Sequence, residues 1–258
     1  MKKTLIEKTA DKLVNAFING KIIAPISTKF TKKLVEAQKL RKLCESKVKD
    51  PIIGFKAAGT GFPVMKKLKE KEPFYAAIFK KNFLKNGQKV KINKSTFGIE
   101  LEVCYLIKQS FFTSKGSITI KNVTKYISHM APCIEVIGYR QRKKGITSFG
   151  DLCSDFGANF KFLIGQKKKY KRINIGNLKT VISNKKIKQS VSGNTNTVYI
   201  NPLNSLRFVL NKLKKDKINL NKGFYVFTGS TVGVVPIKSK GLYVGKIEKL
   251  GSVKTIIF

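Results

Sequence analysis

Three glutamates lie within apolar, strand-like segments of the sequence. Glu100 and Glu102 belong to the stretch 97–107, and Glu135 belongs to the stretch 131–137. A buried carboxylate is costly unless it is paired or bound to a metal. Alternate residues of a strand point to the same face, so Glu100 and Glu102 would present two oxygens to one ion. Hard divalent cations such as Mg²⁺ or Mn²⁺ prefer oxygen ligands of this kind.

Pairing with lysine is the alternative explanation for these acids, because the chain has 53 basic residues and only 14 acidic ones. However, two acids on one face of a strand repel each other unless a cation lies between them, and Glu135 would add to that repulsion. We therefore favour a metal site formed by Glu100, Glu102 and Glu135.

Two other segments carry groups that suit chemistry. Lys56 follows an apolar run and precedes a glycine turn at Gly59. This position predicts partial burial and a lowered pKa, which an acid/base group can use. Thr228 and Gly229 end another apolar run, and a strand that opens into Thr-Gly can expose backbone N–H groups and a hydroxyl to an anion. An ordinary hairpin turn explains this second segment equally well. We interpret His129, the single histidine, as structural.

The elements that must position these groups follow from apolar periodicity and turn residues. Helical spacing predicts helices at 4–19, 31–47, 121–130 and 202–215. Short apolar runs between turn signals predict strands at 51–59, 97–107, 132–139, 160–165, 224–228, 232–237, 243–249 and 252–258. The pattern indicates an α+β protein with helices concentrated early. We divide it into an N-terminal helical portion with the Lys56 strand, residues 1–74, and a β-rich metal-binding body, residues 75–258; one continuous domain is the alternative.

The formal charge of +39 is typical of a nucleic-acid binder, but only five of the 53 basic residues are arginine. The lysines are scattered and accompany abundant asparagine, isoleucine and phenylalanine. We interpret the charge mainly as compositional drift of the surface, so that any nucleic-acid binding would be nonspecific. The four cysteines form no C-x-x-C pair, and no run is long enough to span a membrane. We expect a cytoplasmic protein.

Six segments taken in order resemble one known family. They are 53–59 (IGFKAAG), 98–103 (GIELEV), 131–140 (APCIEVIGYR), 201–204 (NPLN), 220–229 (LNKGFYVFTG) and 250–253 (LGSV). The chain resembles the 2-keto-4-pentenoate hydratase / 4-oxalocrotonate decarboxylase family, within the fumarylacetoacetate hydrolase superfamily. The resemblance runs nearly end to end, and the E-x-E pair with a distant glutamate and a late Thr-Gly strand is its most specific part.

The resemblance implies a mixed β-sheet roll with an N-terminal helical portion, and a homo-oligomer. It also implies that Glu100, Glu102 and Glu135 hold Mg²⁺ or Mn²⁺, with the remaining positions taken by water or by the substrate's 2-oxo acid group. Lys56 matches the active-site lysine, which assists proton transfer or binds the carboxylate. The substrate-binding loop corresponds to Thr228 and Gly229.

Two segments depart from the family pattern. The chain reads Pro-Phe-Tyr-Ala at 73–76, where the family usually has an acidic residue, and Asp-Phe-Gly-Ala at 155–158, where the family often reads Asp-Asn-Ala-Ser. These changes leave the metal ligands intact and affect the hydration step.

The predicted function is a metal-dependent lyase of aromatic-compound catabolism that acts on a small unsaturated 2-oxo acid or 2-hydroxydienoate. A hydro-lyase of the 2-keto-4-pentenoate hydratase type is favoured, with decarboxylation as the other reaction. A catalytically impaired member whose basic surface binds RNA or a ribonucleoprotein is the alternative. An acylpyruvate hydrolase is disfavoured, because those relatives use a His-Glu pair on an early loop and His129 lies elsewhere.

Overall fold

The computed structural model describes residues 3–141 and 146–258. Its helices are α1 (Leu5–Asn19), α2 (Leu34–Lys47), α3 (Phe62–Lys67), α4 (Phe149–Ser154) and α5 (Pro202–Lys215). Helix α1 begins where Thr4 and Glu7 cap each other, and it ends at Gly20, which has a left-handed backbone. Asn201 caps α5, with Pro202 at the first helical position.

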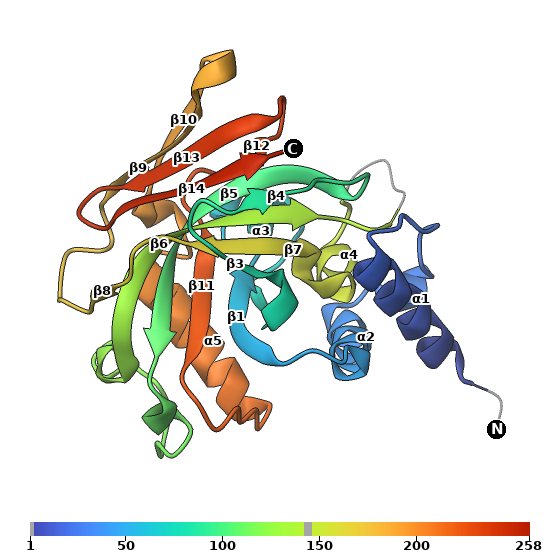
Figure 1. Cartoon of the computed structure of the whole chain (residues 1–258). Helices are drawn as coiled ribbons and strands as arrows, with labels where there is room; N and C mark the ends of the chain where they lie inside the picture. Colours follow the sequence, from blue (N-terminus) through green and yellow to red (C-terminus); the bar gives the residue numbers. More distant parts are fainter. Residues whose placement is uncertain (1–2, 142–145) are drawn as a thin grey trace.

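Two sheets form the body of the molecule (Figure 1). The larger sheet has the strand order β2 (Phe74–Phe79), β1 (Ile52–Ala58), β11 (Phe224–Ser230), β5 (Thr96–Ile107), β6 (Ile127–Gly138), β7 (Asn159–Ile164) and β3 (Phe83–Lys85), with β12 (Val235–Pro236) beside β5 and β8 (Lys168–Lys169) beside β6. The smaller sheet has the order β10 (Gln189–Asn194), β9 (Lys179–Asn184), β13 (Gly241–Ile247), β14 (Gly251–Ile257) and β4 (Lys89–Val90).

The larger sheet curls into a roll with an apolar interior. Strands β1 and β6 have two strands between them, which would separate them by about 14 Å in a flat sheet. Side chains from β1 and β6 nevertheless meet inside the roll, as described below. A cluster of buried apolar side chains fills part of this interior: Ile78, Cys104, Cys133, Phe162 and Phe227.

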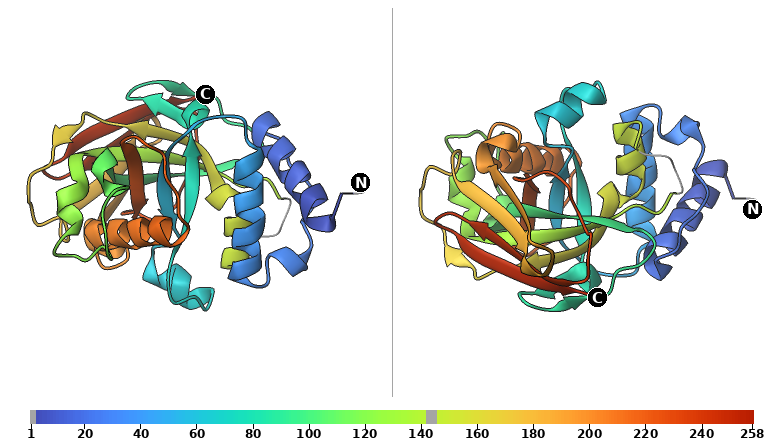
Figure 2. Two further views of the ribbon diagram at one scale, coloured as in Figure 1. Left: turned by 90° about the horizontal axis from the view of Figure 1, so that it is seen from below. Right: turned by 90° about the horizontal axis from the view of Figure 1, so that it is seen from above.

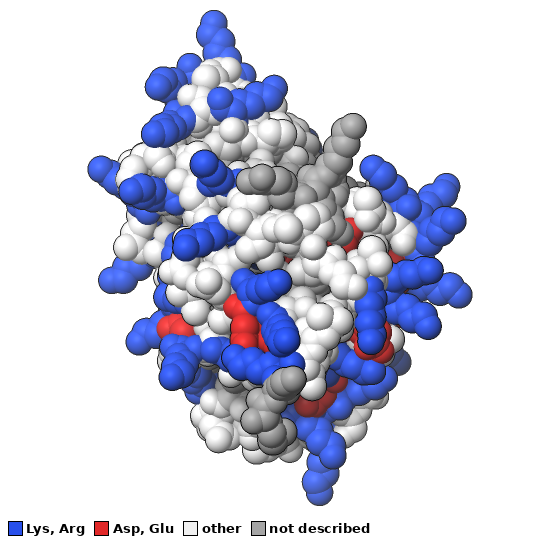
Figure 3. Space-filling view, turned by 90° about the vertical axis from the view of Figure 1, so that its right-hand side faces the viewer, with Lys and Arg blue, Asp and Glu red and all other residues white. Residues whose placement is uncertain are grey.

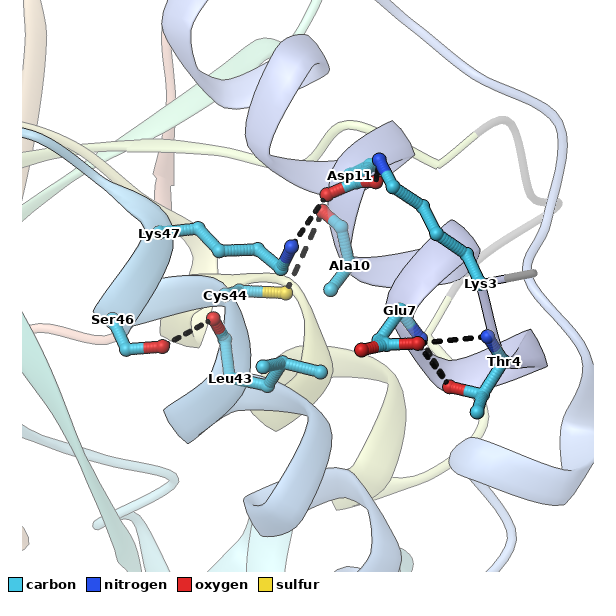
Figure 4. Close-up of polar contacts among 9 residues, drawn as sticks. All are labelled: Lys3, Thr4, Glu7, Ala10, Asp11, Leu43, Cys44, Ser46 and Lys47. Atoms are coloured by element: carbon cyan, nitrogen blue, oxygen red, sulfur yellow. Dashed lines mark hydrogen bonds and ion pairs between the residues drawn. The ribbon is translucent and has the colours of Figure 1, made fainter. Parts of the chain in front are cut away.

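The two long N-terminal helices lie side by side at one end of the molecule (Figure 2). The Lys47 ammonium on α2 lies 2.8 Å from an Asp11 carboxylate oxygen on α1, and Lys3 pairs with the other oxygen of Asp11 (Figure 4). At the far end of α1, the Phe17 ring stacks on Phe156 with a centroid distance of 4.2 Å. Helix α1 therefore contacts both α2 and the segment that follows α4.

Helix α2 covers the edge of the larger sheet. Strand β2 is the edge strand, and an edge normally leaves backbone groups unpaired. Here a Glu45 carboxylate oxygen accepts the Ala77 N–H at 2.8 Å, and the Asn159 amide donates to the Ala77 carbonyl at 2.7 Å. The buried Arg41 holds the Glu45 carboxylate by an ion pair on the same helix. This contact fixes the helical layer against the roll.

The predicted helix 121–130 is wrong. Its first half forms a 3₁₀ turn, Val123–Tyr126, and β6 begins at Ile127. Pairing with β5 continues from Gly138 back to Ile127, so the sheet overrides the local helical pattern. The helices predicted at 4–19 and 202–215 are confirmed, whereas the short helices α3 and α4 and the strands β2, β9 and β10 were not predicted.

Strand β1 lies inside the larger sheet, between β2 and β11, and residue 74 is the first residue of β2. The division at residues 74 and 75 remains a prediction. Across residues 3–141 and 146–258, no helix combines the length and the apolar character needed to cross a bilayer.

Candidate metal centre

The three glutamates meet because β5 and β6 pair in one particular register. Glu100 and Glu135 are direct partners across the two antiparallel strands, and Glu102 lies two residues further along β5 on the same face. One carboxylate oxygen from each residue falls within 4.8 Å of the others. The structure therefore brings together the three acids that the sequence analysis grouped.

Glu102 and Glu135 each have one carboxylate oxygen that accepts a hydrogen bond and a second oxygen that has none. The backbone N–H of Gly229 donates to Glu102 Oε2 at 2.8 Å, and the Lys56 ammonium donates to Glu135 Oε1 at 2.5 Å. Glu102 Oε1 and Glu135 Oε2 are buried, and neither has a hydrogen-bond partner among the described residues. A divalent cation bound between the carboxylates would satisfy these two oxygens.

The electrostatics of the three carboxylates indicate the same need for positive charge. Burial raises the pKa of Glu135 to about 8, against the stabilising effect of Lys56. Burial, together with the charges of Glu135 and Glu100, raises the pKa of Glu102 well above its ordinary value. Burial also raises the pKa of Glu100. Lys56 alone does not neutralise the three acids.

Lys56 is fixed by two acceptors inside the roll. Its ammonium lies 3.1 Å from the Gly157 carbonyl oxygen in addition to its contact with Glu135. Burial opposes the charge of Lys56, but the attraction of Glu135, Glu100 and Glu102 outweighs it and raises the lysine pKa. The lowered pKa predicted from the sequence is therefore wrong for the metal-free structure, because that reasoning considered burial without the carboxylates.

The turn that offers the Gly157 carbonyl has an unusual backbone. Phe156, Gly157 and Ala158 all have positive φ angles, of 54°, 65° and 61°. Only glycine adopts this region freely, so the other two residues carry strain that the surroundings must stabilise. The stabilising contact is a buried ion pair just before the turn: both Asp155 carboxylate oxygens accept hydrogen bonds from Arg140, at 2.5 and 2.6 Å.

A cavity of about 400 Å³ leads to this centre, with Lys56 and Glu100 in its wall. Its other polar side chains are Thr60, Lys67 and Ser230. Apolar side chains make up most of the remaining wall: Val64, Leu68, Phe97, Ile137, Ile146, Leu152 and Val234. Such a cavity suits a small molecule with an anionic head and an unsaturated carbon chain.

The predicted substrate residues Thr228 and Gly229 lie on β11 beside the acids. The Thr228 hydroxyl is fully buried and donates to the Val103 carbonyl at 2.8 Å, whereas Gly229 lines the cavity. Gly229 has a φ of 105°, and a Cβ there would lie 2.0 Å from Thr60 Oγ1, so this position requires glycine. The substrate roles of both residues remain predictions.

Sequence reasoning missed Thr60 and Ser230, which line the cavity, and the Arg140–Asp155 pair. Thr60 directly follows the predicted segment 53–59, and Ser230 directly follows Gly229. Their position next to these segments could have identified them. His129 lies six residues before Glu135 on β6, about 20 Å away along the strand, and is absent from the cavity wall.

The donor set fits a hard divalent cation. Mg²⁺ binds oxygens at about 2.1 Å, which places neighbouring ligand oxygens about 3 Å apart and opposite ones about 4 Å apart. The ligand oxygens of Glu100, Glu102 and Glu135 lie within 4.8 Å of one another. Small side-chain adjustments would therefore bring them to the separations that Mg²⁺ requires. All three candidate donors are carboxylates, which disfavours softer metals that prefer sulfur or imidazole.

Neither a search of protein-family profiles nor a search of curated proteins finds a match to this chain. Solved structures do match. The 4-oxalocrotonate decarboxylase from Pseudomonas putida G7, complexed with magnesium and adipate, superposes with a TM-score of 0.86 at 19% identity, over 100% of this chain and 99% of that one. The chain has the fold of the fumarylacetoacetate hydrolase superfamily. The predicted fold class and the resemblance are thus confirmed at the level of fold.

More distant structures with this fold carry other activities. Fumarylpyruvate hydrolase from Pseudomonas aeruginosa, in complex with Mn²⁺ and pyruvate, has a TM-score of 0.60 at 11% identity, over 82% of this chain and 91% of that one. A 5-carboxymethyl-2-hydroxymuconate delta-isomerase from Mycobacterium smegmatis has a TM-score of 0.56 at 12% identity, over 81% of this chain and 80% of that one. The fumarylacetoacetate hydrolase fold thus accompanies several reactions, and only the site can distinguish them.

Proposed function

We propose that this protein is a metal-dependent lyase that decarboxylates a small unsaturated 2-oxo acid. The observation that carries the proposal is the set of unpartnered oxygens on Glu102 and Glu135 beside Glu100, at the end of a mostly apolar cavity. The similar decarboxylase structure contains magnesium and adipate, a dicarboxylate.

Glu100, Glu102 and Glu135 would hold Mg²⁺ or Mn²⁺. Three carboxylates carry three negative charges, of which Lys56 balances one, and a divalent ion would balance the other two. When bound and chelated by the 2-oxo acid group, the cation would stabilise the negative charge that develops on the 2-oxo oxygen as CO₂ leaves.

Lys56 would serve as the proton donor. Its three neighbouring carboxylates keep it protonated, and its contacts with Glu135 and Gly157 fix its direction. Loss of CO₂ leaves an electron pair delocalised over the substrate, and one carbon must then take a proton. A positioned ammonium at the end of the cavity provides that proton within hydrogen-bond reach.

The cavity favours decarboxylation over the hydration preferred from the sequence. Adding water requires a base that activates it, yet Glu100 is the only acidic residue among the described side chains of the cavity wall. The segments 73–76 and 155–158 also lack the polar residues usual in relatives, and Asp155 is committed to Arg140. An apolar wall instead promotes loss of a carboxylate by leaving it poorly solvated.

A turnover assay tests the proposal. Metal-free protein should release CO₂ from 4-oxalocrotonate only after Mg²⁺ or Mn²⁺ is added, and the Glu102→Gln variant should lose this turnover. Hydration of 2-hydroxypenta-2,4-dienoate, measured in parallel, should be slower. Turnover that persists in the presence of a chelator would contradict the metal role, and faster hydration would contradict the choice of reaction.

The face drawn in Figure 3 does not favour a nucleic-acid function. Figure 3 shows lysine and arginine side chains spread over the whole visible face, without a continuous stripe or groove. Electrostatic recognition of a polyanion requires the charges to gather along its path. The scattered distribution agrees with drift of surface positions toward lysine.

A further inference from the structure

A second pocket lies outside the metal centre. It has a volume of about 280 Å³ and lies where the end of α1 meets the 3₁₀ turn Lys80–Asn82 and strand β7. The polar residues that matter in its wall are Lys81, Asn82, Asn93, Arg140 and Lys161. None of the described residues in this wall is acidic.

Two lysines, Lys81 and Lys161, line this pocket, and their positive charges repel each other. The half-buried Lys161 ammonium donates to the Lys81 backbone carbonyl at 2.9 Å, and the Lys81 ammonium lies 5.4 Å from the centre of the Phe17 ring in the same wall. Burial lowers the pKa of Lys161, and repulsion by Lys81 lowers it further, with Asp50 offsetting part of the effect. The Asp50 carboxylate accepts the Lys81 backbone N–H at 2.9 Å and is not part of the pocket wall.

Further donors surround the same space. The buried Arg140 belongs to the pocket wall and uses one N–H of each guanidinium nitrogen for Asp155 or for the Asn159 carbonyl. Asn93 Oδ1 accepts from Ser95, so its NH₂ group turns toward Gly20, where a Cβ would lie 2.4 Å from Asn93 Nδ2. The wall therefore combines two lysines with N–H donors; Asn82 donates its NH₂ group to the Phe160 carbonyl and adds one acceptor oxygen, and no described wall residue is acidic.

From this arrangement we infer that the pocket binds a small phosphate-type oxyanion, either inorganic phosphate or the phosphate group of a metabolite. Lysine binds phosphate as a point charge, and charge-assisted hydrogen bonds are strongest where the cations are partly desolvated. Asp155 already neutralises Arg140, so the net positive charge comes from Lys81 and Lys161 and matches a dianion.

Calorimetric titration of the full chain with inorganic phosphate at constant ionic strength tests this site. Wild-type protein should show saturable 1:1 binding, and the Lys81→Met/Lys161→Met variant should bind at least about tenfold more weakly. The control is Lys80→Met/Lys89→Met, which removes the same charge from exposed lysines outside the pocket wall and should match wild type. Equal weakening in both variants, or no saturable binding in wild type, would overturn the inference.

A parallel titration with glycerol phosphate separates the two sources of the anion. Tighter binding of the monoester than of phosphate assigns the site to a phosphorylated metabolite; binding of phosphate alone assigns it to the inorganic ion. If the double variant does not fold, Lys81→Met alone removes an exposed side chain and gives the same comparison. Phosphate binding that Lys81→Met leaves unchanged would then contradict the site.

Discussion

Lys56 on β1 and Gly157 in the turn after α4 are 101 residues apart in the chain, yet the lysine ammonium lies 3.1 Å from the glycine carbonyl oxygen. The same ammonium reaches Glu135 on β6. The position of the proposed proton donor thus depends on a strained turn as well as on the curled sheet. Changes that disturb the turn should alter Lys56 without touching any metal ligand.

Gly157→Ala is expected to destabilise the protein and reduce turnover. Its φ is 65°, and a new Cβ would lie 2.9 Å from the Ala76 Cβ. The backbone strain and the steric contact together should cost about 2–3 kcal/mol of unfolding free energy, measured by urea denaturation. Gly116→Ala is the matched control, since its φ is 71° with open space around it, and it should cost only about 1 kcal/mol. Equal losses would show that the turn is not closely packed.

Glu102→Gln is expected to weaken Mg²⁺ binding by more than about 100-fold, because it replaces a charged ligand with a neutral one. In metal-free protein the same change removes repulsion from Glu135 and Glu100, so the variant should melt at a higher temperature than wild type under chelation. Calorimetry and thermal melts with EDTA and with Mg²⁺ measure both effects. The exposed Glu72→Gln serves as the control and should change neither by a comparable amount, because its ion pair with Lys212 lies at the surface. Unaltered Mg²⁺ affinity in Glu102→Gln would exclude this residue as a ligand.

The metal-free protein should lose stability as the pH rises from about 4.5 to 8. Burial raises the pKa of Glu135 from 4.5 to about 8, so the folded state keeps a proton that the unfolded chain releases in this range. The free energy of unfolding then falls with increasing pH. Urea denaturation in EDTA at several pH values measures the slope, which should be flatter in Glu135→Gln. An identical slope in the variant would mean that other groups control it.

The same proton makes metal binding dependent on pH. A cation must displace it, so Mg²⁺ affinity should increase as the pH rises toward 8, with protons released on binding. Calorimetry in buffers of different ionisation enthalpy counts the released protons. Binding that is independent of pH between 6 and 8 would contradict the raised pKa.

Arg140→Met is expected to cost about 3–5 kcal/mol, because it leaves the fully buried Asp155 without its partner. The exposed pair of Lys39 and Glu36 offers a control, since Lys39→Met removes one ion-pair partner at the surface and should cost less than about 1 kcal/mol. Chemical denaturation compares the two variants. Similar small losses in both would show that the turn at 156–158 does not depend on this pair.

The sequence predicted the grouping of the three acids better than their surroundings. The spacing of Glu100 and Glu102 within one apolar strand places both on one face by geometry alone. Glu135 was grouped with them because it is a third acid in an apolar, strand-like segment, but its position opposite Glu100 depends on the register of β5 against β6. Local patterns do not encode pairing between distant strands.

The missed features share a physical cause. Phe156 and Ala158 adopt positive φ, although neither residue type signals such a turn, because the Arg140–Asp155 pair and packing around Phe156 hold them there. The mostly polar strands β9 and β10 lack the apolar alternation that identifies a strand. The segment 121–130 has helical periodicity but pairs with β5 instead. In each case tertiary contacts override local preference.

The place of β11 in the larger sheet has a consequence for synthesis of the chain. Residues 224–230 lie between β1 and β5, so the 223 residues before them cannot complete the larger sheet until this late strand is added. Since chains emerge from the ribosome N-terminus first, β1 and β5 must wait with open edges, a state prone to self-association. A nascent chain stalled before residue 224 should therefore need a chaperone, and metal loading should follow synthesis of β11.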